Sequence, residues 1–547
     1  MQSGKNKIEI NKKPGNRMVS GVMLLTLSTL ICKIIGLLFK IPIINIVGID
    51  GMAYFSAAYN VYMVLNSLSA AGLPIALSIL VSRSLASGKF TNVKKVFRLS
   101  LALFLLLGVL GTLVLYFGAD YYSEVIGINE ASLAVKAIAP TLLFICISGA
   151  IRGYFQGYEF MTPTAISQLI ESIGKLLLGV GLAYCCVNLG KNSTITAAAA
   201  VVGLSAGVML SVVYLTVHLF CFNKKHRRIG VESDTIDSES GKKILRDLFI
   251  IAFPITVSSC ITSLTGLADT ALITNRLIYG GFSTDAAVGL YSSYTNLAIP
   301  LFNLPPALIT SIGISLIPAL SGAVERGALR ESQKTFSVAL RLCGLLAIPS
   351  AAGLAIFAKP ILCTLYPNEI EACTFAAPLL SVLSAAIVFS CLITVCNATL
   401  QSYMKQSLPI VSMAIGAVVK IVLEYILVGT ELGIYGAPIS TVACTFTILI
   451  LDLVFITLYT PQRISVGPIA RIFASSVFGI GIGAVVYYFC SNSTADFLVL
   501  MVSIFVSCIM YAVFSLLFGA VTHSDIAPIK ILKPIADILI KYKLIKS

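Results

Sequence analysis

Runs of apolar residues long enough to cross a lipid bilayer recur along the whole chain. About 20 such residues suffice for one helical crossing. Because backbone polar groups inside lipid must bond within their own segment, each run is predicted to form a helix. The predicted spans are residues 18–47, 53–81, 97–118, 133–155, 164–189, 196–222, 248–276, 288–319, 335–358, 373–399, 409–429, 436–459, 468–490 and 496–520. The sequence therefore predicts an all-α integral membrane protein with about 14 transmembrane helices.

The composition excludes an ordinary soluble globular protein. Hydrophobic residues make up 57% of the 547 residues and charged residues only 11%, whereas soluble domains are about 45–50% apolar. The net charge of +14 does not indicate nucleic-acid binding, because the basic residues form no patch interleaved with aromatic side chains. They gather instead between the apolar runs, mostly in segments on one side, which is typical of cytoplasmic loops. We expect a multi-pass membrane protein with both termini in the cytoplasm.

A long polar segment divides the apolar runs into two sets of six. The predicted organisation is a basic cytoplasmic tail (1–17), an N-terminal lobe (18–222), a cytoplasmic linker (223–247), a C-terminal lobe (248–459), two further helices (460–520) and a second basic cytoplasmic tail (521–547). The two lobes share short motifs in the same order, for example YFSAAYN at 54–60 and LYSSYTN at 290–296. Because six helices is an even number, both lobes keep one orientation. This predicts a pseudo-two-fold axis along the membrane normal and a substrate site between the lobes.

Charged residues inside the apolar runs are the strongest indication of function. Each costs about 2.5–3.5 kcal/mol at the centre of a membrane helix on insertion scales. A set of them predicts a polar cavity between helices and favours transport over simple anchoring. They are Lys33, Lys40, Glu171, Lys175, Asp269, Arg276, Lys420 and Glu424.

Lys33 and Lys40 lie seven residues apart in the first predicted helix, so both fall on nearly one face. That helix contains no acidic residue before Asp50. Two ammonium groups on one face predict a site for a polyanion such as a pyrophosphate. The alternative is that one or both side chains reach along the helix to the membrane interface.

Two pairs of opposite charge have the spacing of neighbours on a helix surface. Glu171 and Lys175 are four residues apart, and so are Lys420 and Glu424. Either pair is a structural ion pair or a part of a ligand or ion-coupling site. Asp269 is a candidate to carry a proton or to meet a lysine of the C-terminal lobe. The amides of Asn60 and Asn296 are predicted to face either the cavity, as polar groups of its wall, or neighbouring helices.

No arrangement for covalent chemistry is visible. The chain lacks a phosphate-binding loop of the GxxxxGK[ST] type, which excludes an ATPase on this chain. His218, His226 and His523 are scattered and predict neither a metal site nor a catalytic triad. We therefore expect a protein that is not an enzyme, with no catalytic residue, metal or cofactor.

Four segments resemble a known family of transporters. They are KIIGLLFKIPIINIVGIDGMAYFSAAYNVYMVLNSLSAAGLPIALSILVSRSLASG (33–88), RGYFQGYEFMTPTAISQLIE (152–171), LADTALITNRL (267–277) and LFNLPPALITSIGISLIPALSGA (301–323). They are similar to the stage V sporulation protein B and MurJ-like family of lipid-linked oligosaccharide flippases. This family belongs to the multidrug/oligosaccharidyl-lipid/polysaccharide exporter superfamily.

The resemblance implies a two-lobed flippase of fourteen helices. Its implied substrate is an undecaprenyl-pyrophosphate-linked saccharide, such as the peptidoglycan precursor lipid II, used in cell-wall or spore-cortex synthesis. In MurJ-like relatives, basic residues of the first, second and eighth helices hold the pyrophosphate. Lys33 and Lys40 fall in the first helix, but the second and eighth lack basic residues at the matching places. Arg83 and Arg276, near helix ends, are candidates to replace them.

The resemblance also implies alternating access coupled to the membrane potential, H⁺ or Na⁺. It further implies a monomer in a bacterial cell membrane, with membrane lipids and cell-wall synthesis proteins as its partners. Two alternatives stay open at this point. One is a cation-coupled multidrug exporter of the same superfamily, and the other is a scaffold for envelope assembly that transports nothing.

Overall fold

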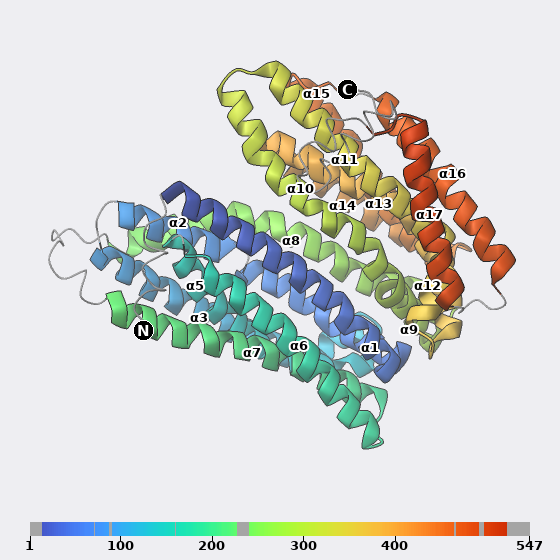
Figure 1. Cartoon of the computed structure of the whole chain (residues 1–547). Coiled ribbons are helices and arrows are strands. Elements are labelled where there is room, and N and C mark those ends of the chain that lie inside the picture. Colours follow the sequence, from blue (N-terminus) through green and yellow to red (C-terminus); the bar gives the residue numbers. More distant parts are fainter. Residues whose placement is uncertain are drawn as a thin grey trace, which may run out of the picture. The chain divides into compact units, whose positions relative to one another are not determined.

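The structure is a computed structural model that describes seven stretches of the chain. They are residues 14–70, 72–86, 90–158, 160–226, 240–463, 466–491 and 497–521. Every regular element within these stretches is a helix (Figure 1). This confirms the predicted all-α class. The two predicted tails lie almost wholly outside the described residues, as does most of the predicted linker.

Eleven helices of the described part are long and apolar enough to cross a membrane. They are Leu27–Leu65, Thr91–Val125, Asn129–Gly157, Thr162–Asn188, Ser193–Phe222, Leu329–Ile356, Ile370–Ser402, Ser407–Val428, Gly433–Tyr459, Gly467–Cys490 and Phe497–Leu517. The chain is therefore a multi-pass membrane protein. The predicted number of fourteen spans stays a prediction.

The chain forms two compact units, Met1–Ala271 and Leu272–Ser547. The boundary between them falls inside the helix α8 (Gly241–Tyr279), beyond the segment 223–247 that the sequence analysis takes as a linker. The predicted lobe boundaries therefore stay predictions, and the two units are described separately below.

The first helix, α1 (Pro14–Ala70), consists of two helical arms that meet at Gly48. Gly48 has a φ of 79° and a ψ of 172°, a conformation that a residue with a side chain rarely adopts. The apolar part of α1 is 39 residues long, or about 58 Å at 1.5 Å per residue. That length is nearly twice the hydrocarbon thickness of about 30 Å. The break at Gly48 lies between the predicted spans 18–47 and 53–81, and a separate helix, α2 (Gly72–Ala86), follows α1.

Further helices after α2 complete the first unit. They are α3 (Phe90–Val125), η2 (Asn129–Ala131), α4 (Ser132–Ile138), α5 (Thr141–Gly157), α6 (Thr162–Asn188), α7 (Ser193–His226) and the part of α8 up to Ala271. α6 and α7 lie side by side (Figure 1) and pack at glycines. A Cβ atom on Gly174 would lie 2.9 Å from Cα of Gly207. Such small residues let membrane helices approach closely.

The second unit has its own bundle, which consists of the end of α8 from Leu272 and the elements that follow it. Its elements are α9 (Thr284–Ser292), the π-helix η3 (Ser293–Ala298), α10 (Ile299–Glu325), α11 (Leu329–Ile356), α12 (Ala358–Leu365), α13 (Ile370–Ser402), α14 (Ser407–Val428), η4 (Gly433–Tyr435), α15 (Gly436–Tyr459), α16 (Val466–Cys490) and α17 (Phe497–Leu517). α16 and α17 form a pair in which Gly479 leaves room for the backbone of Tyr511. This pair corresponds to the two extra helices that the sequence analysis predicts after residue 460.

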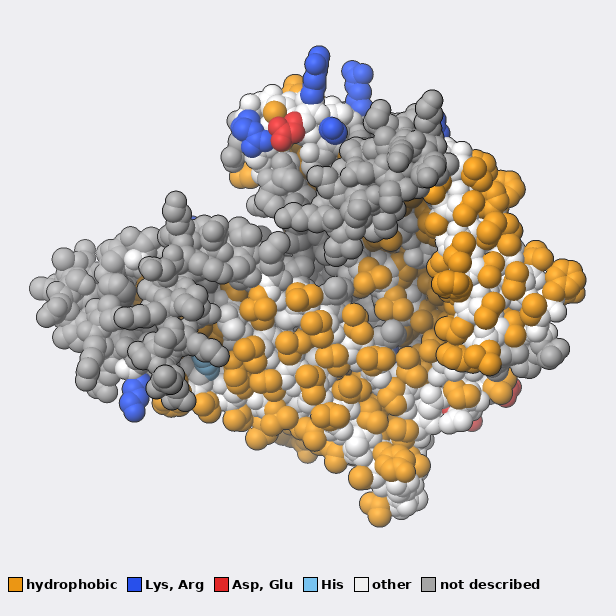
Figure 2. Space-filling model, in the orientation of Figure 1, with side chains coloured by type: hydrophobic (Ala, Val, Ile, Leu, Met, Phe, Trp, Pro, Cys, Tyr) orange, Lys and Arg blue, Asp and Glu red, His pale blue; other side chains and the backbone are white. Residues whose placement is uncertain are grey.

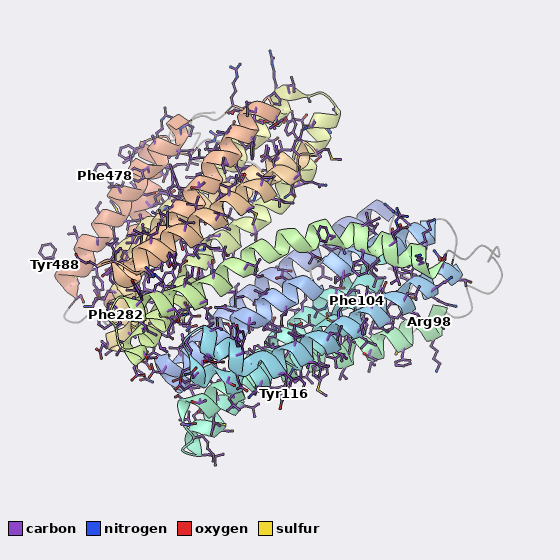
Figure 3. The ribbon with its side chains drawn as sticks, turned by 180° about the vertical axis from the view of Figure 1, so that it is seen from behind. Arg98, Phe104, Tyr116, Phe282, Phe478 and Tyr488 are labelled. Atoms are coloured by element: carbon purple, nitrogen blue, oxygen red, sulfur yellow. The ribbon has the colours of Figure 1, made fainter. Side chains whose placement is uncertain are left out.

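Exposed apolar side chains cover the helices of both units. Hydrophobic side chains spread over α6 and α7 and over α16 and α17 (Figure 2). Phe478 and Tyr488 project outward from α16, whereas Phe104 on α3 is fully buried (Figure 3). Continuous apolar surfaces of this kind mark contact with a membrane or a partner. In this chain they fit helices that face lipid.

Candidate functional site

Three charged side chains form a cluster inside the first unit, between α5, α6 and α7. Arg152 on α5 is its centre. Its Nε donates a hydrogen bond to Oγ of Ser167 at 2.9 Å, and its Nη2 donates to Oε2 of Glu171 at 2.8 Å and to Oγ of Ser211 at 2.9 Å. The planar guanidinium can make these contacts together because its donors point in several fixed directions. Arg152, Glu171 and Lys175 are called the charge cluster below.

Lys175 completes the charge cluster from α6. Its Nζ donates to Oε1 of Glu171 at 2.6 Å, so each carboxylate oxygen holds a different cation. The contact between Glu171 and Lys175 has the i,i+4 spacing that the sequence analysis recognises. The contact from Arg152 to the same carboxylate joins a second helix to this local pair.

The charge cluster is unbalanced and partly open. It contains two cations and one carboxylate, and within the described part of the chain neither cation pairs with another acidic group. The side chains of Arg152, Glu171 and Lys175 keep 17%, 16% and 24% of their surface exposed. A formal charge of +1 among apolar helices therefore remains on side chains that the described residues cover only in part.

Close packing of α7 holds the backbone under the charge cluster in place. A Cβ atom on Gly207 would lie 2.5 Å from the backbone N of Lys175 and 2.9 Å from the backbone O of Glu171. Any residue larger than glycine at this position would push α7 away from α6. α1 contacts α6 through Oγ of Ser28, which donates to Oε1 of Gln168 at 3.3 Å.

A row of aromatic rings on α1 lies beside the charge cluster. The ring centroids of Phe39 and Phe55 are 5.9 Å apart, those of Phe55 and Tyr59 are 6.0 Å apart, and those of Tyr59 and Tyr62 are 5.8 Å apart. Tyr59 lies within electrostatic range of Lys175. The second arm of α1 therefore contributes to the surroundings of the charge cluster.

Lys33 and Lys40, the predicted pyrophosphate ligands, both lie on the first arm of α1. The Lys33 side chain lies outside the described part of the structure. Lys40 is half-buried and makes no hydrogen bond or ion pair with the residues that the structure describes. Its ammonium group is therefore a further cation within a membrane helix of the first unit, and it has no described counter-ion.

Arg83 and Arg276, the candidates to supply further cations, lie near helix ends. Arg83 is exposed in the last turn of α2. Arg276 belongs to the second unit, where its Cζ lies 4.6 Å from the ring centroid of Tyr279 and 4.2 Å from that of Tyr425. Its Nε also donates to the backbone O of Tyr425 at 2.9 Å. These contacts fasten the end of α8 to α14.

The predicted cavity residues Asn60 and Asn296 both make hydrogen bonds to neighbouring side chains. Asn60 donates to Oγ1 of Thr270 at 2.8 Å, which joins α1 to α8 in the first unit. Asn296 is fully buried in the π-helix η3 and donates to Oγ of Ser292 at 3.0 Å. Asp269 lies next to Thr270 on α8 and is partly buried.

Lys420 and Glu424 are buried on α14 in the second unit, with 8% and 0% of their surface exposed. Contact between Asp269 and a lysine of the C-terminal lobe stays a prediction, because Asp269 belongs to the first unit and Lys420 to the second.

Arg152 is the functional candidate that the sequence analysis misses. It has no acidic residue three or four positions away in its own helix, so its pairing cannot be recognised from local spacing. One signal was present, because a lone arginine in a predicted span is itself an indication of a functional site.

Two family models match the chain. The model described as polysaccharide biosynthesis protein matches residues 18–324, and the model described as MatE matches residues 254–426. Among curated proteins, stage V sporulation protein B of Bacillus subtilis (strain 168) is 26% identical over 518 residues, which cover 94% of this chain and 98% of that protein. The lipid II flippase MurJ of the same organism is 25% identical over 75% of this chain and 77% of its own length.

Solved structures share the fold. The inward closed conformation of lipid II flippase MurJ has a TM-score of 0.71 at 16% identity, over 91% of this chain and 98% of that chain. An inward-facing multidrug resistance MATE family transporter has a TM-score of 0.63 at 16% identity, over 80% of this chain and 97% of that chain. These matches confirm the resemblance recognised in the sequence.

Proposed function

The chain belongs to the polysaccharide biosynthesis protein family, and from this premise we propose that it is a flippase for undecaprenyl-pyrophosphate-linked cell-wall precursors. At the coarser level it is a membrane transporter of the multidrug/oligosaccharidyl-lipid/polysaccharide exporter superfamily rather than an enzyme. The proposed substrate is lipid II or a related lipid-linked oligosaccharide, which moves from the inner to the outer leaflet for peptidoglycan synthesis, including that of the spore cortex.

The charge cluster is the observation that carries this proposal. A structural ion pair in a membrane helix needs one cation for one carboxylate, yet Glu171 holds both Arg152 and Lys175. The surplus cation is costly in an apolar bundle unless an anion meets it. Arginine and lysine side chains are the usual ligands of phosphate groups. A diphosphate headgroup matches this chemistry, whereas a cationic drug does not.

Named relatives support the same substrate class. One curated relative is a lipid II flippase and another is a stage V sporulation protein. Each is similar to this chain over at least three quarters of the chain. Lys40, with no described counter-ion, adds a further cation to the first unit. Lys33 is proposed to act with it.

We propose alternating access as the transport mechanism, with the headgroup inside the protein and the polyprenyl chain in lipid. The inside-negative membrane potential favours outward movement of an anionic headgroup by about 2.3 kcal/mol per charge for each 100 mV. Coupling to H⁺ or Na⁺ is the alternative energy source. The proposal includes a monomer with both termini in the cytoplasm that hands its product to cell-wall synthesis proteins.

Complementation tests the proposal. A bacterial strain depleted of its own lipid II flippase is supplied with the wild-type gene or with a gene that carries Lys33→Gln and Lys40→Gln together. The proposal expects growth with the wild type and none with the double variant, at equal protein levels in the membrane. Failure of the wild type to support growth, together with no accumulation of any lipid-linked precursor when the native gene is deleted, would contradict it.

The match to the MatE model gives a second candidate, a cation-coupled multidrug exporter. Efflux of cationic dyes from cells that produce the protein distinguishes the two functions. Export of these dyes, abolished by Asp269→Asn and untouched by Arg152→Gln, would favour the exporter. The flippase proposal expects no dye export.

A further inference from the structure

We propose that Glu171 is a built-in competitor of the transported anion. Its carboxylate occupies Arg152 and Lys175 when the site is empty, and a diphosphate displaces it from these cations on binding. This inference rests on the proposed function and deepens it, because it assigns the anion site to named residues and gives the acidic residue within that site a role.

The spacing of the two cations fits a single bridging anion. Arg152 and Lys175 contact different oxygens of one carboxylate, at 2.8 Å and 2.6 Å. A phosphate group presents pairs of oxygens to the same kinds of donor. An anion that takes the place of the carboxylate can therefore bind both cations at once.

Arg152 does not depend on Glu171 for its position. Its Nε is held by Ser167 and its Nη2 also donates to Ser211. The hydroxyl of Ser167 in turn donates to the backbone O of Thr164 at 2.7 Å, which fixes its oxygen as the acceptor for Arg152. The guanidinium therefore stays in place when the carboxylate moves away.

The carboxylate of Glu171 has room to move away from the two cations, and its competition weakens binding of the incoming anion. Glu171 keeps 16% of its side-chain surface exposed, so the surrounding protein atoms leave its carboxylate room to move when an anion replaces it. The Glu171 carboxylate and the diphosphate compete for Arg152 and Lys175. Neither anion can therefore pair fully with both cations while the other is bound. Binding of the diphosphate is therefore weaker than two free cations would give, and its release is easier.

Removal of the competitor changes affinity and turnover in opposite directions. The charge of the site rises from +1 to +2 in Glu171→Gln. Attraction between a diphosphate and the site then increases, and we expect pyrophosphate to bind about tenfold more tightly or better. Because transport requires release, the same variant is expected to show a lower KM and a lower maximal rate of flipping.

The test measures binding of inorganic pyrophosphate to the full-length protein in lipid nanodiscs, by calorimetry at constant ionic strength. Glu171→Gln is expected to lower Kd about tenfold, and Arg152→Gln is expected to raise it. Glu331→Gln is the matched control, because Glu331 is an exposed carboxylate that pairs with Arg326 at 2.9 Å in the second unit. It is expected to leave Kd unchanged.

A double variant keeps the test decisive if Glu171→Gln does not fold. The single variant Arg152→Gln has a neutral site, whereas Arg152→Gln with Glu171→Gln has the same +1 charge as the wild type. The inference expects the double variant to bind pyrophosphate more tightly than Arg152→Gln alone. Equal affinity of these two proteins would overturn it.

The outcomes separate the inference from the proposed function. If the wild type binds pyrophosphate and Glu171→Gln binds it equally or more weakly, Glu171 is a structural partner, and the inference fails while the proposed function stands. If the wild type binds neither pyrophosphate nor lipid II in the nanodisc, both fail.

Discussion

Arg152 on α5 donates a hydrogen bond of 2.8 Å to Glu171 on α6, and this contact converts a local ion pair into a site with surplus positive charge. Without Arg152, Glu171 and Lys175 would neutralise each other within one helix. With it, a carboxylate shared by two cations lies where three membrane helices meet. The predictions below start from this relationship.

Replacement of Arg152 by glutamine should abolish transport and lower stability. The change leaves Ser167 and Ser211 without their charged donor and removes one of two ion pairs of Glu171. Because Lys175 still compensates the charge of Glu171, the expected cost is that of lost hydrogen bonds to a charged group, about 1.5–3 kcal/mol. We expect a lower thermal midpoint in detergent and no complementation. Arg152→Lys should restore part of the stability but little transport, because one ammonium group cannot reproduce the three contacts; full activity of this variant would contradict the assigned geometry.

Replacement of Gly207 by alanine should disturb the charge cluster without touching a charge. The new Cβ would lie 2.5 Å from the backbone N of Lys175, so α6 and α7 must separate. Gly181→Ala, on the solvent- or lipid-facing side of α6 with nothing within 4 Å of the added atom, is the matched control. Gly207→Ala should lower both the thermal midpoint and the growth of the complemented strain, whereas the control should leave both unchanged. Equal behaviour of the two variants would show that close packing at Gly207 is unimportant.

Replacement of Lys40 by glutamine should separate function from stability. Lys40 has no described counter-ion, so the change breaks no described ion pair, and removal of a charge from a membrane helix is favourable by up to about 3 kcal/mol. The variant should be at least as stable as the wild type and yet weaker in transport. Lys175→Gln is the comparison, since it loses an ion pair of 2.6 Å and should be less stable. A Lys40→Gln protein that transports normally would exclude Lys40 from the site.

A buried hydrogen-bond network should stabilise the second unit. Nε2 of Gln462, which follows α15, donates to Oγ of Ser332 at 2.6 Å and to Oη of Tyr403 at 2.8 Å. Gln462→Ala removes both of these hydrogen bonds, although Ser332 and Tyr403 keep the one between them at 3.0 Å, and should cost about 1–3 kcal/mol. Gln406→Ala, at an exposed glutamine before α14, is the control. Differential scanning fluorimetry should show a lower midpoint for the first variant only, and similar midpoints would argue against the network.

Much of the fold follows from the sequence because hydropathy and helix length are local properties. Apolar runs of the required length predict helices wherever they occur, and the structure has helices there. The break in α1 was also within reach, since Gly48 lies in the short gap between two predicted spans. The division of α8 between two units was not, because the units depend on packing between distant segments and not on the polar segment before the helix.

The candidate site was predictable only in part. Glu171 and Lys175 are neighbours on one helix, and their spacing alone predicts their contact. Arg152 reaches them from a different helix, 19 residues before Glu171, and no periodicity records such a meeting. Gly207 is a second example, because the sequence cannot show which neighbouring backbone packs against a glycine that has no side chain.

Flipping of labelled lipid II by purified protein in liposomes tests the central claim most directly. The lipid is loaded into both leaflets, reacted on the outside with a membrane-impermeant reagent, and followed as protected molecules reach the outer leaflet. The account predicts rapid flipping by the wild type and background flipping by a protein with Arg152→Gln and Lys175→Gln together. Flipping by this double variant at the wild-type rate would contradict the claim that the charge cluster binds the headgroup.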